Sequence, residues 1–181
     1  MLFTKAEIEE GLLAPVDELV ASGVTSAIYV VGGAAIMLHV EREALTNDVD
    51  VLYSSAEIRA SVRSVGVAKR WPETWLNDAA KMWASHYDGD DDWEIRFTRG
   101  DVSVRVAQPL LLLAMKLLAG RGRRDAMDID LLLEECRIGS FDDALAVFDK
   151  YYPTERIAPR SPRQLHERFD RTENLGEGSA H

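Results

Sequence analysis

Apolar residues recur along this chain with two periods, one typical of strands and the other typical of helices. Residues 28–31 form a short β-branched and aromatic run, which is the pattern of a buried strand. Residues 48–53 alternate charged and apolar side chains, so they predict a second strand whose charged residues share one face. Two more strands, joined by a turn at a Gly-Asp pair, are predicted over residues 94–98 and 102–107.

Helical patterns fill most of the remaining chain. Thr4 and Glu7 have the spacing of a capping box, and the helix that they open should end near Ser22. The acidic residues 88–92 lack the spacing of an EF-hand loop and indicate a solvated loop. We predict further helices over residues 34–42, 55–65, 72–80, 110–118, 125–135 and 141–151, and a last short one from Ser161.

The order of these elements predicts an α+β fold with mixed α/β content. Strands concentrate before residue 108 and helices after it, so we expect a small mixed β-sheet with helices on it, followed by a helical C-terminal half. A length of 181 residues suits one domain. We expect a single domain over residues 1–171, with a sheet-containing core at about 1–107, a helical part at about 108–171 and a flexible tail at 172–181.

The composition is that of a globular protein in water, with 46% hydrophobic and 29% charged residues. The single cysteine, Cys136, excludes an internal disulfide and fits a reducing compartment. The first residues lack the apolar stretch of a signal peptide, and the longest apolar run, residues 109–118, is too short to span a bilayer. We therefore expect a cytoplasmic protein with no membrane contact.

The formal net charge of −10 argues against extensive coating by nucleic acid, because such binding is mostly neutralisation of phosphates. Local basic surfaces are still compatible with it. Two basic clusters are either solvated helix faces or such surfaces, and the pattern favours neither interpretation. They comprise Arg59, Arg63, Lys69 and Arg70, and Arg121, Arg123 and Arg124.

Three features carry candidate chemistry, and the first is the pair Gly32 and Gly33. The pair ends the strand at residues 28–31 and runs directly into a helix. Backbone N–H groups at a helix N-terminus suit phosphate, and the missing side chains let a ligand approach closely. The alternative is a tight strand-to-helix turn that binds no ligand.

The second feature is the pair Asp48 and Asp50. On one strand face their side chains lie roughly 6.5–7 Å apart, so they repel each other unless a cation lies between them. A divalent metal such as Mg²⁺ accepts oxygens from both and takes its other ligands from water and nucleotide phosphates. The alternative is an exposed face of an edge strand, but aspartate is a poor strand former. We therefore favour a metal site.

The third feature is Lys116, a charged residue inside the apolar helix at 110–118. A helix that is apolar nearly all round is buried. A buried ammonium group needs a carboxylate or phosphate partner. The alternative is that Lys116 extends from the helix end to water.

These features occur together in one known family. The order Gly32-Gly33-Ala34-Ala35, a short helix, then Thr46-Asn47-Asp48-Val49-Asp50 resembles the glycine–glycine/serine and DxD signature of the minimal nucleotidyltransferases. Residues 112–119, with Arg121, Arg124, Asp125 and Asp128, are similar to the later lysine and aspartate motifs of the AbiEii/MenT-type enzymes, which belong to type IV toxin–antitoxin and phage-defence loci of bacteria. With residues 75–78 and 151–153, the resemblance covers roughly residues 26–160.

The resemblance implies a nucleotidyltransferase core with a helical C-terminal half. It also implies an enzyme dependent on Mg²⁺ (or Mn²⁺) that moves a nucleoside monophosphate from an NTP to an RNA acceptor, with the tRNA 3′ end favoured, and a toxin whose partner is a cognate antitoxin protein. The implied roles are nucleotide binding for Gly32, Gly33, Arg42 and Thr46, metal binding for Asp48 and Asp50, phosphate contact for Lys116, and orientation of Lys116 or general-base catalysis for Asp125 or Asp128.

The chain departs from the family pattern at three places. Gly33 stands where many relatives carry serine, and Arg42 lies earlier than the arginine that often precedes the aspartates. On the strand where many active members carry a third carboxylate, this chain has Arg105 in the middle and only Asp101 at the start. Two other functions therefore stay open, namely a binding or regulatory module with weak or absent catalysis, and transfer to a protein or small molecule such as an aminoglycoside.

Overall fold

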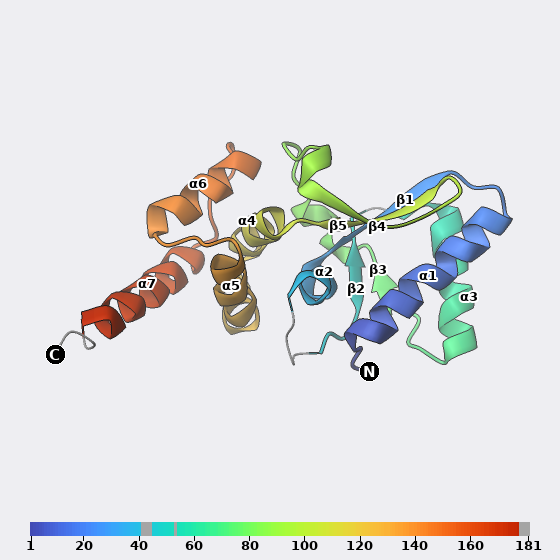
Figure 1. The fold of residues 1–181 in the computed structure, drawn as a ribbon, viewed down its shortest axis with the longest axis horizontal. Coiled ribbons are helices and arrows are strands. Elements are labelled where there is room, and N and C mark those ends of the chain that lie inside the picture. The colour runs from blue at the N-terminus through green and yellow to red at the C-terminus, as the bar shows by residue number, and fades with distance from the viewer. Residues whose placement is uncertain (41–44, 53, 178–181) are drawn as a thin grey trace. The chain divides into compact units, whose positions relative to one another are not determined.

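The computed structural model describes residues 1–40, 45–52 and 54–177, which form two compact units (Figure 1). The first unit comprises residues 1–84 and 89–108, and the second comprises residues 85–88 and the chain from Pro109 onward. The mixed content of helices and strands confirms the predicted α+β fold class. The main division, between Gln108 and Pro109, lies where the sequence predicts the change from the sheet to the helical part.

Within the described residues, five strands of the first unit form one mixed sheet in the order β3-β2-β1-β5-β4. The central strand β1 is parallel to β5 and antiparallel to β2, β3 is parallel to β2, and β4 is antiparallel to β5. The strands are β1 (Ser26–Val31), β2 (Val49–Val51), β3 (Leu76–Asn77), β4 (Trp93–Arg99) and β5 (Val102–Ala107).

One face of this sheet is the core of the first unit. Alternate residues of the two central strands point to this face and are fully buried, namely Ile28, Val30, Val102, Val104 and Val106. The helices of this unit are α1 (Lys5–Ala21), α2 (Gly32–His39) and α3 (Ala56–Lys69). Helix α1 contacts β4, β5, α2 and α3, and α2 contacts β1, β2 and β5, so these elements form one layer over the sheet. The other face carries half-buried side chains, including Tyr29 and Arg105.

Side-chain caps explain where two of these helices begin. The Thr4 hydroxyl accepts a hydrogen bond from the Glu7 backbone N–H, and the Glu7 carboxylate accepts one from the Thr4 backbone N–H, which is the predicted capping box. Helix α3 begins after Ser55, whose hydroxyl accepts a hydrogen bond from the Ile58 N–H.

Two sequence predictions in this unit differ from the structure. Helix α3 continues through Gly66 to Lys69, because Gly66 faces the indole of Trp75, where a Cβ would lie 3.1 Å from the ring. The predicted helix at 72–80 does not form. Instead, Leu76 and Asn77 pair with β2 as strand β3, and a 3₁₀ helix follows at Ala79–Trp83. The free energy gained by pairing these residues with β2 at the sheet edge outweighs the helical propensity of the segment.

The second unit is helical, as the sequence predicts. Its helices are α4 (Pro109–Ala119), α5 (Arg123–Glu135), α6 (Phe141–Tyr151) and α7 (Ser161–Glu177). The apolar helix α4 contacts α5 and α6 and is buried along most of its length. The Ser161 hydroxyl donates to the Leu117 carbonyl oxygen, which ties the start of α7 to α4. Helix α7 extends to Glu177, further than the short helix that the sequence predicts from Ser161.

Among the described residues, no helix combines the length and the apolar character that crossing a membrane requires.

Candidate functional site

The backbone of Gly32 lies against the side chain of Asp50. Gly32 begins α2 with a φ of 68°, a left-handed conformation that favours glycine. A Cβ at this position would lie 2.6 Å from the Asp50 Oδ2 atom, so no other residue fits without displacing the carboxylate. Gly33 follows as the second residue of α2, and the N-cap residue Val31 supplies no side-chain hydrogen bond to the first turn. The first turn of α2 therefore has no side-chain cap from Val31 and begins beside a carboxylate.

The register of the sheet places Asp50 beside this turn. Asp50 lies in β2 and pairs with Val31, the last residue of β1, so the aspartate and the start of α2 meet at the same end of the sheet. Asp50 is half-buried. The proximity of Gly32 and Asp50 is therefore a feature of the fold.

Asp48 lies immediately before β2 and is also half-buried. Its Oδ2 accepts a hydrogen bond of 3.3 Å from the side-chain amide of Asn77 in β3. Its backbone carbonyl accepts one of 3.0 Å from the Thr46 hydroxyl, and Thr46 is fixed by a backbone bridge to Phe3. Thr46 thus holds the backbone of Asp48 in this structure, whereas the resemblance implies that it binds nucleotide.

Asp48 and Asp50 offer two carboxylates of the donor type that a divalent ion takes together with water or phosphate. Oxygen atoms are the donors that Mg²⁺ prefers, and both aspartates are half-exposed, which leaves room for water and phosphate. The close approach of Gly32 to Asp50 allows a phosphate on the first turn of α2 to share such an ion. Among the described residues, no group of three or more His, Cys, Asp or Glu side chains is placed to hold a metal.

Asp101, the weak candidate for a third carboxylate, lies at the other end of the sheet. It precedes Val102, which pairs with Ser26 at the start of β1, whereas Asp50 pairs with Val31 at the end of β1. Six residues of strand correspond to roughly 20 Å. Asp101 therefore cannot share a metal ion with Asp50.

Arg105 shares the half-buried sheet face with Asp50, because it pairs with Tyr29, two residues before Val31. Its guanidinium carbon lies 5.9 Å from the centroid of the Tyr29 ring, and one terminal nitrogen is 3.1 Å from an oxygen of Asp90. Its Nε atom is buried and has no hydrogen-bond partner within the described part of the chain. The middle of this strand therefore carries a cation on the sheet face that Asp50 shares.

Lys116 forms a separate cluster within the second unit. Its ammonium nitrogen lies 2.7 Å from Asp125 and 2.8 Å from Asp128, and the lysine is only 6% exposed. Both aspartates lie on α5 at a spacing of three residues, which places them on one helix face. The buried interpretation of Lys116 with carboxylate partners is therefore correct, and its side chain does not extend to water.

The two aspartates of this cluster differ in their surroundings. Asp125 is fully buried; its Oδ1 accepts from Lys116, and its Oδ2 accepts from the backbone N–H and the Nε of Arg121. Burial raises the pKa of Asp125, but the hydrogen bond and charge of Lys116, together with Arg121, outweigh burial and hold this pKa below its ordinary value. Asp125 is thus an ionised group that orients Lys116, and Asp128 is the more accessible partner.

A scan against models of protein families, a search of curated proteins and a search of solved structures each gave no match.

The structure therefore brings the predicted residues together in two groups. The first unit holds Gly32, Gly33, Thr46, Asp48 and Asp50, and the second unit holds Lys116, Asp125 and Asp128. Arg42 lies outside the described residues, as do the side chains of Arg123 and Arg124.

Sequence reasoning missed one residue of the first group, Asn77, which holds the Asp48 carboxylate. Asn77 lies in a segment noted for its family resemblance, but the wrong prediction of a helix there hid its place beside β2. The sequence gives no signal for this contact, because the contact depends on the parallel pairing of β3 with β2, which lies far away in the sequence.

Proposed function

We propose that this protein is a nucleotidyltransferase that moves a nucleoside monophosphate from an NTP to a hydroxyl group of an RNA acceptor, with the tRNA 3′ end favoured. The observation that carries the proposal is the position of the Gly32 backbone against the Asp50 carboxylate. It combines a phosphate-binding helix start with a metal-binding side chain in one place. A structural turn alone would need glycine for its φ angle, but it would not need an aspartate at contact distance.

In this proposal, Gly32 and Gly33 bind the triphosphate through backbone N–H groups, and Asp48 and Asp50 hold Mg²⁺ or Mn²⁺ between them. A divalent ion held there supplies neutralisation of the phosphate charge and polarisation of the phosphoryl group. Thr46 and Asn77 fix Asp48 from its backbone and side chain, which keeps the carboxylates in place before substrate binds.

The reaction forms a phosphodiester bond to the acceptor and breaks the phosphoanhydride bond between the α- and β-phosphates. The acceptor hydroxyl oxygen attacks the α-phosphorus, the bond to the β-phosphate breaks, and pyrophosphate leaves with the electron pair. The hydroxyl proton passes to a base, for which the resemblance implies Asp125 or Asp128. The contacts of Asp125 suit it to orienting Lys116 rather than to accepting this proton.

The biological role follows from the resemblance alone. We propose that the protein is the toxin of a toxin–antitoxin system and that its cognate antitoxin binds it as a protein partner. The net charge of −10 suits an antitoxin with a basic binding surface.

A labelling experiment tests the proposal. Purified protein is incubated with Mg²⁺, total tRNA and each of the four labelled NTPs in turn, beside the variant Asp48→Asn/Asp50→Asn. The variant Asp17→Asn/Asp142→Asn, which removes two carboxylates outside the site, is the matched control. We expect label to enter RNA with the wild type and the control, and to fall by at least about 100-fold when the metal ligands are changed. Equal labelling in all three proteins would contradict the assigned site.

A second candidate function is a nucleotide-binding or regulatory module without catalysis. It is favoured by a specific observation, since the described residues supply two carboxylates for a metal and Arg105 lies on the strand where a third is common. Nucleotide binding without transfer to RNA, protein or a small molecule would support this function over the first.

A further inference from the structure

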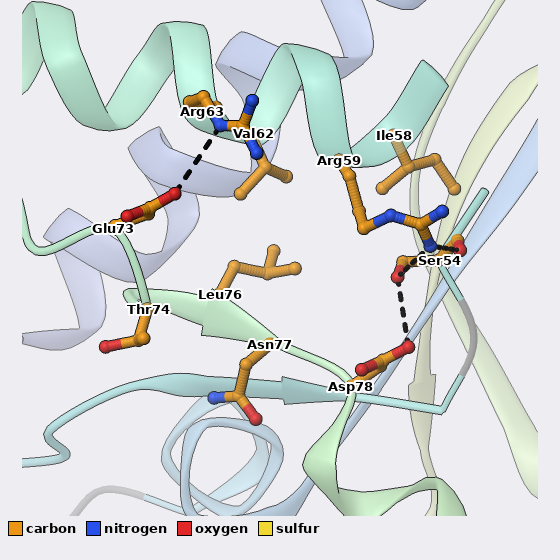
Figure 2. A pocket seen from close by; sticks show the side chains of 10 residues that line it. All are labelled: Ser54, Ile58, Arg59, Val62, Arg63, Glu73, Thr74, Leu76, Asn77 and Asp78. Atoms are coloured by element: carbon orange, nitrogen blue, oxygen red, sulfur yellow. Dashed lines mark hydrogen bonds and ion pairs between the residues drawn. The ribbon is translucent and has the colours of Figure 1, made fainter. Parts of the chain in front are cut away.

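A pocket in the first unit lies between α3 and β3, at the edge of the sheet (Figure 2). Its volume is about 230 Å³, below the roughly 300–1,000 Å³ of pockets for drug-sized ligands. It therefore encloses one ring system, and the rest of a larger ligand would lie along the polar rim. The residues that line it are Ser54, Ile58, Arg59, Val62, Arg63, Glu73, Thr74, Leu76, Asn77 and Asp78.

The floor of the pocket is apolar and its rim is polar. Ile58 and Val62 of α3 point toward Leu76 of β3, and all three are buried. The exposed Thr74 adds a hydroxyl at the rim. A flat ring that carries hydrogen-bonding groups matches this combination, because the ring covers the aliphatic floor and its edge meets the polar groups.

Two arginines supply positive charge on one side of the pocket. Arg59 and Arg63 lie four residues apart on α3, so their guanidinium groups emerge from the same helix face. Arg59 donates to neutral acceptors, the carbonyl and the hydroxyl of Ser54. Its charge is therefore available to an anion.

The acidic groups of the rim do not cancel this charge. Arg63 pairs with Glu73 at 3.6 Å, but the side chains are 69% and 79% exposed, so water screens the pair and a bound anion displaces it at little cost. Asp78 accepts from the Ser54 hydroxyl and lies 3.5 Å from Lys81, which balances its charge. An anionic group thus has two cationic partners, and Arg binds phosphate especially well because its donors form a planar fork.

The pocket is connected to the candidate metal site through Asn77. This residue lines the pocket, and its amide donates to the Asp48 carboxylate on the other side of β3. The adjacent Leu76 points to the α3 side, as alternation along a strand requires. A ligand in the pocket is therefore one side chain away from Asp48.

We propose that this pocket binds a single nucleoside monophosphate unit, with the base on the floor formed by Ile58, Val62 and Leu76 and the phosphate on Arg59 and Arg63. The unit is either a free mononucleotide or the terminal nucleotide of a single-stranded RNA, which present the same chemistry. The assignment of this unit as the acceptor of nucleotide transfer rests on the proposed function; the binding itself does not.

Binding is measured with the full chain in EDTA, so that no metal-dependent NTP site contributes. The probes are 5′-AMP, followed by calorimetry, and a 5′-fluorescein hexaribonucleotide with a free 3′ end, followed by anisotropy. Arg59→Gln/Arg63→Gln removes the phosphate partners, and Thr74→Trp obstructs the pocket from an exposed position without changing its charge. Arg99→Gln/Arg163→Gln removes the same charge from exposed positions elsewhere and is the matched control.

We expect both pocket variants to bind at least about tenfold more weakly than the wild type, and the control to bind as the wild type does. Tighter binding of the hexaribonucleotide than of 5′-AMP identifies an RNA end as the source, and equal binding identifies the free nucleotide. Equal affinity in all four proteins, or no binding of either probe to folded wild type, overturns the proposal. Pocket binding without label transfer would contradict the proposed function and leave the pocket assignment intact.

Discussion

At the scale of single residues, both candidate groups depend on how closely side chains and backbone approach each other. Gly32 has no side chain because the Asp50 carboxylate occupies that space. Lys116 is buried because Asp125 and Asp128 balance its charge. The sequence predicted the glycine pair, the two aspartates and a buried Lys116 with an anionic partner as separate features, but the contact between Gly32 and Asp50 and the double pairing of Lys116 required coordinates.

The variant Gly32→Ala tests the first contact. Any non-glycine residue in the left-handed region costs roughly 1–2 kcal/mol, and forcing the Asp50 side chain aside adds about 1–3 kcal/mol. Gly23→Ala is a matched control, because Gly23 has the same φ of 68° but open space around it. We expect Gly32→Ala to lower the free energy of unfolding in urea by more than Gly23→Ala does, and to abolish NTP binding. Equal effects on both quantities would show that Asp50 moves away freely.

The variant Asp125→Asn tests the buried cluster through its dependence on pH. The pKa of Asp125 lies below its ordinary value of 3.8 in the folded protein, so its ionised form stabilises the fold above that pH. We expect the free energy of unfolding of the wild type to exceed that of the variant by about 3 kcal/mol at neutral pH. This value is at the lower end for loss of a buried pair, because Asp128 still pairs with Lys116.

That difference should decrease as the pH falls below 3.8 and through the folded-state pKa, because the wild-type carboxylate then takes up a proton as well. Urea unfolding between pH 3 and pH 7 measures it. Asp128→Asn, which changes the more exposed partner, should lower the free energy of unfolding by less than Asp125→Asn does. A difference that is unchanged over this range would contradict the assigned ion pair.

At the scale of elements, local pattern predicted most helices and strands but failed where pairing over long distances decides. The alternation at residues 48–53 predicted a strand, and β2 forms there, although it begins after Asp48. Residues 72–80 have a helix-like composition, yet the free edge of β2 takes Leu76 and Asn77 as a strand. The helix predicted over residues 55–65 continues through Gly66, whose missing side chain leaves room for Trp75. A short stretch of sequence does not show whether its local propensity or its packing against distant residues decides the structure.

The role of β3 is tested by Asn77→Ala. This change removes the amide that donates to Asp48 and leaves the backbone pairing intact. Loss of a residue that orients a metal ligand typically weakens metal affinity about 10- to 100-fold. We expect Mn²⁺ affinity in the presence of NTP, measured by electron paramagnetic resonance, to fall within that range. Asn47→Ala, at an exposed position beside Asp48, should leave it unchanged, and equal affinities in the two variants would contradict a positioning role for Asn77.

At the scale of the whole molecule, the sequence predicted an α+β chain with a sheet followed by helices, and the structure confirms this fold class. The order of strands in the sheet was not predictable, because β1 lies between β2 and β5 through pairings that no local pattern indicates. This order decides which side chains meet at each end of the sheet. It brings Asp50 to the end of β1 that carries Gly32, and it places Asp101 at the opposite end.

The most direct test of the account is whether Asp48 and Asp50 hold a divalent ion together with a nucleotide. Mn²⁺ binding is followed by electron paramagnetic resonance with and without a non-hydrolysable NTP, in the wild type and in Asp48→Asn/Asp50→Asn. We expect the wild type to bind Mn²⁺ more tightly with the nucleotide, because the phosphates complete the coordination, and the variant to lose this binding. Mn²⁺ and nucleotide binding of equal strength in both proteins would contradict the site.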